Sequence, residues 1–148
     1  MPELLIDIPI APRAQARARS RIAGKPGKQF VQVYTGKEQR NEADNLRALL
    51  YNQLPVWFKP IQGAVRVTIA AWFTPPQCSM KMYVRYVKGL VPHIKKPDVD
   101  NLAKHVKDCA KGILWLDDKQ VTCLTVSKAY RDSPGWAIWL EWDDGDVH

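Results

Sequence analysis

The alternation of apolar and polar positions predicts several strands along the chain. A short apolar run covers residues 4–8, and the stretch 64–73 alternates Val and Ile with Arg and Thr, as a strand with one buried face does. Two more such runs, 120–130 and 135–142, are joined around the turn-like sequence RDSPG. We expect these last two strands to pair with each other.

Helix-like spacing occurs between these runs. Apolar residues recur at steps of three and four through 36–53, which predicts an amphipathic helix that ends near Pro55. The same spacing through 98–112 predicts a second helix, which stops at its terminal glycine. The basic stretch 79–89 is expected to be a further short helix.

The order of these elements indicates one α+β domain that covers residues 1–148. We expect a mixed, mainly antiparallel sheet with the helices packed on one face. A basic arm, about residues 10–30, contains small residues, Pro and Gly, which favour an irregular arm or a loose hairpin. The acidic C-terminal end, about residues 141–148, is expected to be a solvated tail.

Charge is distributed unevenly along the 148 residues, whose formal net charge is +7. Residues 1–97 carry 16 Lys and Arg against 5 Asp and Glu, a balance of +11, whereas residues 98–148 carry 6 against 10, a balance of −4. A basic, acid-poor half is typical of a surface that docks a polyanion such as DNA. The acidic half then holds the candidate metal ligands.

Cysteine usage and hydropathy exclude several protein classes. The three cysteines, Cys78, Cys109 and Cys123, have no CxxC spacing, so neither a disulfide framework nor a zinc site is indicated. The N-terminus lacks the basic start and unbroken apolar run of a signal peptide. No stretch approaches the roughly 20 apolar residues of a membrane span. We expect a cytoplasmic protein that does not associate with membranes.

Two aspartates, Asp98 and Asp100, begin the second helix after an acid-free stretch that starts beyond Asp44. Pro97 cannot extend the helix backwards, so one of them is expected at the helix N-terminus, where free backbone amides favour a carboxylate. Helix capping alone, worth about 1 kcal/mol, would explain the pair. Lys104 follows Asp100 by four residues and therefore shares its helix face.

A second acidic pair, Asp117 and Asp118, follows the helix. In extended backbone, adjacent side chains point to opposite faces, so we expect only one of the two to join Asp98 and Asp100. Three clustered carboxylates repel one another unless they bind a hard divalent cation, for which Mg²⁺ is the natural occupant. Lys104 could then neutralise a phosphate or stabilise the transition state. A polar turn is the simpler explanation of the pair taken alone.

The sequence KPDVDNLAKHVKDCAKGILWLDDKQV, within residues 95–121, resembles the signature of the RusA-type Holliday-junction resolvases. That signature is a D-x-D-N-L-x-K helix start followed by D-D-x-Q, and every element is present. The Pro/Arg segment near the N-terminus, the first helix and the basic run before the DxD resemble the family more loosely. The stretch 75–94 is longer than in the most compact members, so the resemblance leaves its contacts and the substrate preference open.

The resemblance implies a small, homodimeric, Mg²⁺-dependent DNA endonuclease, with Mn²⁺ as an alternative ion. Such enzymes resolve four-way junctions by paired symmetric nicks in DNA recombination and repair, whether a cell, a phage or a prophage encodes them. Residue by residue, it implies metal ligation by Asp98, Asp100 and Asp118, with Asp117 as a further candidate, and a catalytic role for Lys104. The expected DNA-binding residues are the basic ones of the acid-poor half: Arg13, Arg17, Arg19, Arg21, Lys81, Arg85, Lys88, Lys95 and Lys96.

Other functions use similar residues. A non-catalytic DNA-binding accessory protein would have the same basic half, with the aspartates only capping a helix. A nuclease that trims branched DNA in general is a second alternative. A haloacid-dehalogenase-type phosphatase is disfavoured, because its DxD follows an apolar strand.

Two further expectations concern single side chains. His105 is expected to be a neutral surface histidine. Trp136 and Trp142 are expected to share a face with Ile138, and Trp139 to point the other way, available for core or dimer packing.

Overall fold

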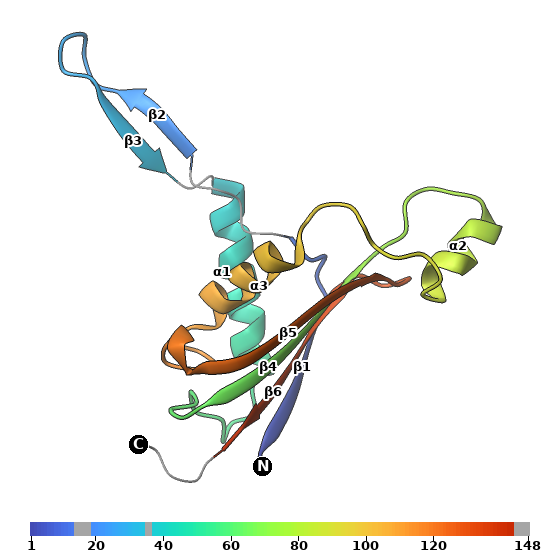
Figure 1. Ribbon diagram of the computed structural model, residues 1–148. Helices are drawn as coiled ribbons and strands as arrows, with labels where there is room; N and C mark the ends of the chain where they lie inside the picture. The colour runs from blue at the N-terminus through green and yellow to red at the C-terminus, as the bar shows by residue number, and fades with distance from the viewer. Residues whose placement is uncertain (14–18, 35–36, 144–148) are drawn as a thin grey trace.

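The computed structural model describes residues 1–13, 19–34 and 37–143 (Figure 1). The elements in chain order are β1 (Glu3–Ile8), β2 (Arg19–Ala23), β3 (Phe30–Tyr34), α1 (Lys37–Gln53), β4 (Val65–Phe73), α2 (Met80–Val87), α3 (Val99–Ala110), the short 3-10 helix η1 (Asp118–Gln120), β5 (Val121–Tyr130) and β6 (Gly135–Trp142). Each predicted helix and strand is therefore present close to its expected bounds.

The main sheet has the strand order β1-β6-β4-β5. Strand β6 is antiparallel to both β1 and β4, whereas β4 and β5 are parallel. Parallel neighbours need a long crossover connection, which here contains α2 and α3. The prediction of one mixed, mainly antiparallel sheet in an α+β domain is confirmed.

The prediction that β5 and β6 pair with each other is wrong, because β4 lies between them. Burial explains the order. Strand β6 places Trp136, Ile138 and Leu140 on its buried face, so its central position in the sheet keeps these large apolar side chains out of water. Strand β5 is mostly exposed and occupies the edge. The link between the two strands passes the end of β4, where the Arg131 amide donates to the Phe73 carbonyl at 2.9 Å.

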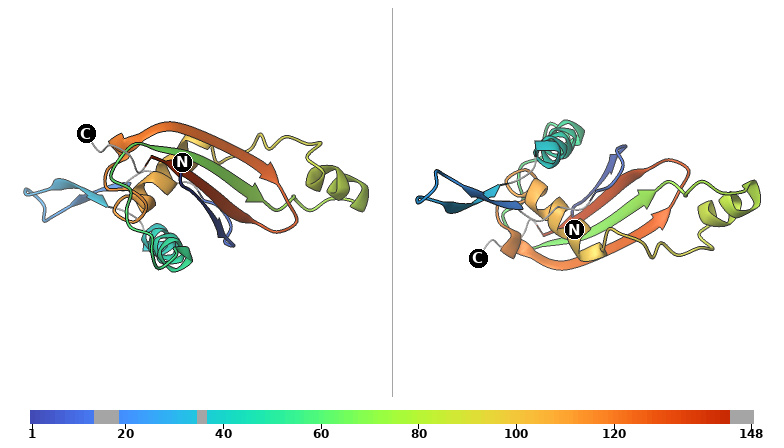
Figure 2. Two further views of the ribbon diagram at one scale, coloured as in Figure 1. Left: turned by 90° about the horizontal axis from the view of Figure 1, so that it is seen from below. Right: turned by 90° about the horizontal axis from the view of Figure 1, so that it is seen from above.

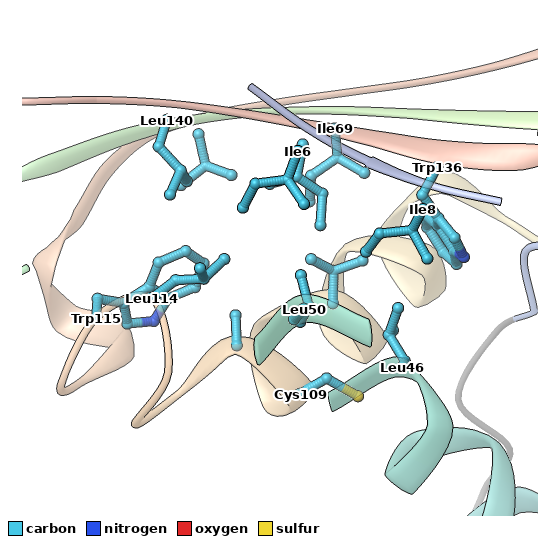
Figure 3. Close-up of a cluster of buried hydrophobic side chains, with 14 of the residues drawn as sticks. Ile6, Ile8, Leu46, Leu50, Ile69, Cys109, Leu114, Trp115, Trp136 and Leu140 are labelled. Atoms are coloured by element: carbon cyan, nitrogen blue, oxygen red, sulfur yellow. The ribbon is translucent and has the colours of Figure 1, made fainter. Parts of the chain in front are cut away.

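The core lies between the sheet and two helices, α1 and α3 (Figure 3). Leu46 and Leu50 of α1 and Leu102 of α3 are fully buried against sheet residues such as Ile69 and Leu140. Packing on one face is thus confirmed for α1 and α3 but is wrong for α2. No residue of α2 is buried, and the helix lies beyond the end of the sheet (Figures 1 and 2).

The basic arm contains an antiparallel hairpin of β2 and β3, which projects from the domain on the opposite side from α2 (Figures 1 and 2). Its turn contains Gly24 and Gly27, both with positive φ, which glycine adopts without strain. The predicted start of the acidic tail, at about residue 141, is too early. Trp142 still belongs to β6 and is buried, while residues 144–148 lie outside the described chain.

Candidate functional site

An open groove of about 650 Å³ lies between α3 and the edge strand β5. It brings together Asp100 and Lys104 from α3 with Asp118 from η1, which are three of the four predicted catalytic residues. The other side chains that line it are those of Val99, Ala103, Lys107, Asp108, Leu124 and Val126. Two segments of the chain separated by the α3–η1 loop therefore place acids and lysines around one cavity.

Asp98 occupies the N-cap position of α3, as the sequence predicts, with extended backbone at φ −72° and ψ 152°. Its carbonyl accepts a hydrogen bond from the Leu102 amide at 3.1 Å. Its carboxylate makes no capping hydrogen bond and is exposed, so capping does not explain the choice of aspartate there. Asp98 is not among the groove-lining residues, but it directly precedes Val99, which is.

Asp118 is oriented by the core. The indole Nε1 of Trp115 donates a hydrogen bond of 2.9 Å to Asp118 Oδ1, and the Trp115 side chain is fully buried. A buried indole N–H needs an acceptor, and the carboxylate supplies it. Sequence reasoning gave Trp115 no role. The available signal was a tryptophan three residues before a candidate ligand.

Asp117 has a structural task instead. It is the N-cap of η1, and its carboxylate accepts a hydrogen bond from the Lys119 amide at 3.1 Å. This bond, with a smaller effect from Lys111 and Lys119 as charges, lowers the pKa of Asp117 against an opposing desolvation. Asp117 does not line the groove. Asp117 has extended backbone, whereas Asp118 begins η1, so the start of a 3-10 helix separates the two neighbouring acids, and not the alternation of a continuous strand.

Gln120 holds the turn that carries both acids. Its Oε1 accepts from the amides of Leu116 and Asp117, at 2.9 and 2.7 Å. Its Nε2 donates to the carbonyls of Ile61 and Gly63, at 2.6 and 2.9 Å. One side-chain amide thus ties the η1 turn to the segment before β4. The sequence showed Gln120 as part of a motif, without indicating this function.

The three predicted metal ligands do not form a closed cluster. Among residues 1–13, 19–34 and 37–143, no three His, Cys, Asp or Glu side chains are close enough to hold a metal ion. Asp100 and Asp118 share the groove, while Asp98 is not among the residues that line it. Residues two apart at a helix start point in different directions, which accounts for the separation of Asp98 from Asp100. The carboxylate oxygens themselves are suitable donors for a hard cation.

Lys104 is exposed and lies one helical turn after Asp100. Within the described parts of the chain, neither Asp100 nor Asp118 forms an ion pair with it. Its ammonium group is therefore not neutralised by the acids beside it. Lys107 adds a second cation on the same wall of the groove.

The predicted DNA-binding residues of the second basic segment are all exposed: Lys81, Arg85, Lys88, Lys95 and Lys96. The first three belong to α2 and its C-terminal cap. This helix is capped by Ser79, whose side chain accepts from the Met82 amide at 3.3 Å. Tyr86 packs edge-on against Tyr130 at the end of β5, with ring centroids 4.8 Å apart. A basic projection is thus attached to the strand that borders the groove.

The predicted DNA contacts of the first basic segment are less well defined. Arg13 is exposed but forms an ion pair of 3.7 Å with Glu42. Burial raises the pKa of Glu42, and the charge of Arg13 opposes that effect. Arg17 lies outside the described residues. Arg19 and Arg21 are on β2, and only their backbone is described.

The expectation that His105 is a surface residue is wrong. Its side chain is 4% exposed and lies on the inward face of α3, with its ring centroid 6.3 Å from that of Trp136. Burial lowers the pKa of His105, and Asp108 partly offsets this, which favours the neutral form. His105 is part of the core packing.

Comparison with known proteins identifies a family whose model matches most of the chain. A family model described as "Endodeoxyribonuclease RusA" matches residues 9–141. A curated relative, "Uncharacterized protein YqaN" of Bacillus subtilis (strain 168), is 38% identical over 77 residues. That alignment covers 50% of this chain and 54% of the relative, so the match spans about half the length of each. The part of the chain that the structure describes contains no helix with the length and hydropathy of a membrane span.

Proposed function

The chain belongs to the RusA endodeoxyribonuclease family, and from this premise we propose that it is a metal-dependent endonuclease that resolves four-way DNA junctions. The observation that carries the proposal is the groove in which Asp100, Lys104 and Asp118 meet. Asp98, whose carboxylate makes no capping hydrogen bond, directly precedes Val99 of the groove lining. Phosphodiester hydrolysis explains acids and an unpaired lysine around one open cavity better than helix capping does.

Asp98, Asp100 and Asp118 are the residues that would hold Mg²⁺, or Mn²⁺ in its place. Their oxygen donors suit a hard cation, and two of them already share the groove. Asp117 is a weaker candidate, because its carboxylate accepts from the Lys119 amide. When bound, such an ion supplies Lewis-acid stabilisation of phosphoryl oxygens and acidifies water.

The chain's own residues would orient the phosphate. The ammonium group of Lys104 lies on the same helix face as Asp100 and forms no ion pair with it. It can stabilise the negative charge that develops on a phosphoryl oxygen. Lys107 adds positive charge on the same helix. Trp115 keeps Asp118 pointing in one direction, since its indole is locked in the core. Leu124 and Val126 give the groove an apolar floor.

DNA would be gripped through phosphates rather than base edges, which gives an affinity that does not depend on sequence. The exposed lysines and arginine of α2 and the following segment are suited to this, since no acid lies between Asp44 and Asp98. The hairpin of β2 and β3 carries Arg19 and Arg21 on the other side of the domain. Two basic projections that flank one groove fit a branched substrate.

A homodimer would supply the two cuts that a two-fold symmetric junction needs. The sheet face opposite the helices supports this, because Leu5 and Trp139 are paired across β1 and β6 and are 62% and 38% exposed. Light scattering at micromolar concentration, with and without junction DNA, tests the dimer. A monomer under both conditions would contradict it.

A cleavage assay tests the proposed function. The substrates are a labelled synthetic four-way junction, a three-way junction and a matched duplex, each with Mg²⁺ and with chelator. We expect symmetric nicks in the four-way junction only, dependent on Mg²⁺ and absent with Asp118→Asn. Cutting of both junctions would favour the looser branched-DNA nuclease. Binding without cutting under any metal would identify a DNA-binding accessory protein and overturn the proposal.

A further inference from the structure

The floor of the groove continues into a lysine that the catalytic motif does not include. Leu124, Val126 and Lys128 are alternate residues of β5, so their side chains leave the same face of the strand. Leu124 and Val126 line the groove. Lys128 is half-buried and comes next in this row, toward the segment that leads into α3.

Lys128 binds the backbone immediately before Asp98. Its Nζ donates to the carbonyl of Lys95 at 2.5 Å and to that of Pro97 at 2.9 Å. Two of the three donors of the ammonium are thus committed to one short segment. A bond between a charged donor and a carbonyl is stronger than one between neutral groups, so Lys128 links β5 firmly to the start of α3.

These bonds help to hold the backbone at Asp98 in place. The Asp98 carboxylate makes no capping bond, so the side chain does not hold itself in place. On the C-terminal side, the Asp98 carbonyl is fixed by the Leu102 amide. On the N-terminal side, the preceding carbonyl is fixed by Lys128. The backbone that carries the carboxylate is therefore held from both sides.

The location of Lys128 is electrostatically unfavourable, which argues that its contacts matter. Lys95 and Lys96 are in the same segment, and like charges repel. Burial, the charge of Lys128 and a smaller effect from Lys95 lower the pKa of His93, so these cations act on one small region. A neutral side chain would avoid the repulsion but would lose the charged donor that bridges the strand and the loop.

We propose that Lys128 is a positioning residue that fixes the backbone from which the Asp98 carboxylate extends, at the start of the helix that carries Asp100. The inference rests on the proposed function, because it concerns the metal ligands. Lys128 acts through the backbone and through Asp98, and it touches neither the metal nor the reacting phosphate.

The first test measures binding of Mn²⁺ alone to the DNA-free protein by electron paramagnetic resonance. Lys128→Met keeps the aliphatic stem and removes the donors. Loss of a residue that orients a metal ligand weakens metal binding about tenfold, and we expect a shift of that size. Cleavage should need correspondingly more Mg²⁺ and recover when Mg²⁺ is in excess. Lys59→Met removes the same charge from an exposed site outside the groove and should change neither quantity.

A double-variant comparison separates positioning from direct contact. In the Asp98→Asn background, Lys128→Met should weaken Mn²⁺ binding no further, because the residue it positions no longer ligates. Unchanged Mn²⁺ affinity in Lys128→Met, combined with weaker junction binding in chelator, would show a direct phosphate contact and overturn the proposal. So would equal losses in the two backgrounds.

Two controls keep the outcome decisive. If Lys128→Met fails to fold, Lys128→Gln, which retains two N–H donors on a shorter chain, is measured instead. It should weaken Mn²⁺ binding in the same direction, and wild-type affinity would overturn the proposal. Asp100→Asn tests the metal site separately from the role of Lys128. If it leaves Mn²⁺ binding unchanged, the proposed metal site fails, whereas an effect of Asp100→Asn without one of Lys128→Met refutes only the role of Lys128.

Discussion

Trp115 Nε1 and Asp118 Oδ1 are 2.9 Å apart, in a hydrogen bond that joins the hydrophobic core to the groove. The indole is fully buried and packs among the core residues shown in Figure 3. Because a rigid, buried ring holds one oxygen of the carboxylate, the second oxygen remains available to the groove. The position of a candidate ligand is thereby set by packing.

Asp98→Asn, Asp100→Asn and Asp118→Asn should each abolish cleavage and leave junction binding intact or tighter. Asparagine keeps the shape of the side chain, and its carbonyl can still accept from Trp115 at position 118. Asparagine lacks the negative charge that binds Mg²⁺, and the loss of that charge also lowers the repulsion of DNA phosphates. Gel shifts in chelator and cleavage in Mg²⁺ measure the two effects. Variants that fold, bind and cut like the wild type would contradict the metal-site assignment.

Asp117→Asn should retain most of the cleavage that Asp118→Asn loses, because Asp117 caps η1 and does not line the groove. Its effect should be on stability. The folded-state pKa of Asp117 is lowered, so its ionised form stabilises the fold at neutral pH, and this contribution is lost as the pH falls through that pKa. Melting curves at neutral and acid pH provide the measurement. Equal loss of cleavage in both variants would place Asp117 among the ligands.

Lys104→Ala should slow cleavage about a hundredfold, the usual effect of removing one group that stabilises a transition state. Junction binding and Mn²⁺ affinity should change little, since many other cations contact the DNA. Lys111→Ala is the matched control, because Lys111 follows the same helix, is exposed and lies outside the groove lining. Single-turnover rates at saturating Mg²⁺ separate the two variants. If Lys104→Ala weakens junction binding but leaves the single-turnover rate unchanged, Lys104 contacts DNA and has no catalytic role.

Junction affinity should fall steeply with salt, on the order of a thousandfold between about 50 and 200 mM for 6–10 phosphate contacts. Replacing Lys81, Arg85 and Lys88 together by Ala should reduce the slope of log affinity against log salt by about three. The helix packs no buried residue, so the domain should still fold. Fluorescence anisotropy over a salt series supplies the slope. An unchanged slope would remove α2 from the binding surface.

The elements that the sequence predicted correctly are those whose local pattern agrees with their final environment. Strand β4 alternates buried positions with exposed or half-buried ones from Val65 to Trp72, and α3 has one apolar face. For the same reason the spacing of Asp100 and Lys104 predicted that they share a face, and both line the groove.

The features that the sequence did not predict depend on contacts between distant segments. A short link between two strands is usually a hairpin, but here β6 pairs with β1 and β4, and β5 pairs with β4. Trp115 and Gln120 act through partners that no local pattern identifies. His105 is buried because α3 turns that side toward Trp136, although a histidine that directly follows Lys104 was expected at the surface.

The burial of His105 predicts a loss of stability in mild acid. Its folded-state pKa is lowered, chiefly by desolvation, whereas in the unfolded chain it returns to about 6.5. Below that value the unfolded state binds a proton that the folded state does not, so the free energy of unfolding decreases as the pH falls. Above it the residue makes no pH-dependent contribution.

His105→Leu should therefore flatten the melting temperature between neutral pH and mild acid, relative to the wild type. His93 has a lowered pKa as well and contributes with the same sign, so His93→Leu and the double variant are scanned alongside. The His105 contribution is the difference that persists in the His93→Leu background, because the two rings make separate contacts, with Trp136 and with Phe73 and Tyr130. If His105→Leu melts with the same pH dependence as the wild type, the histidine is accessible to protons in the folded state and its place in the core is wrong.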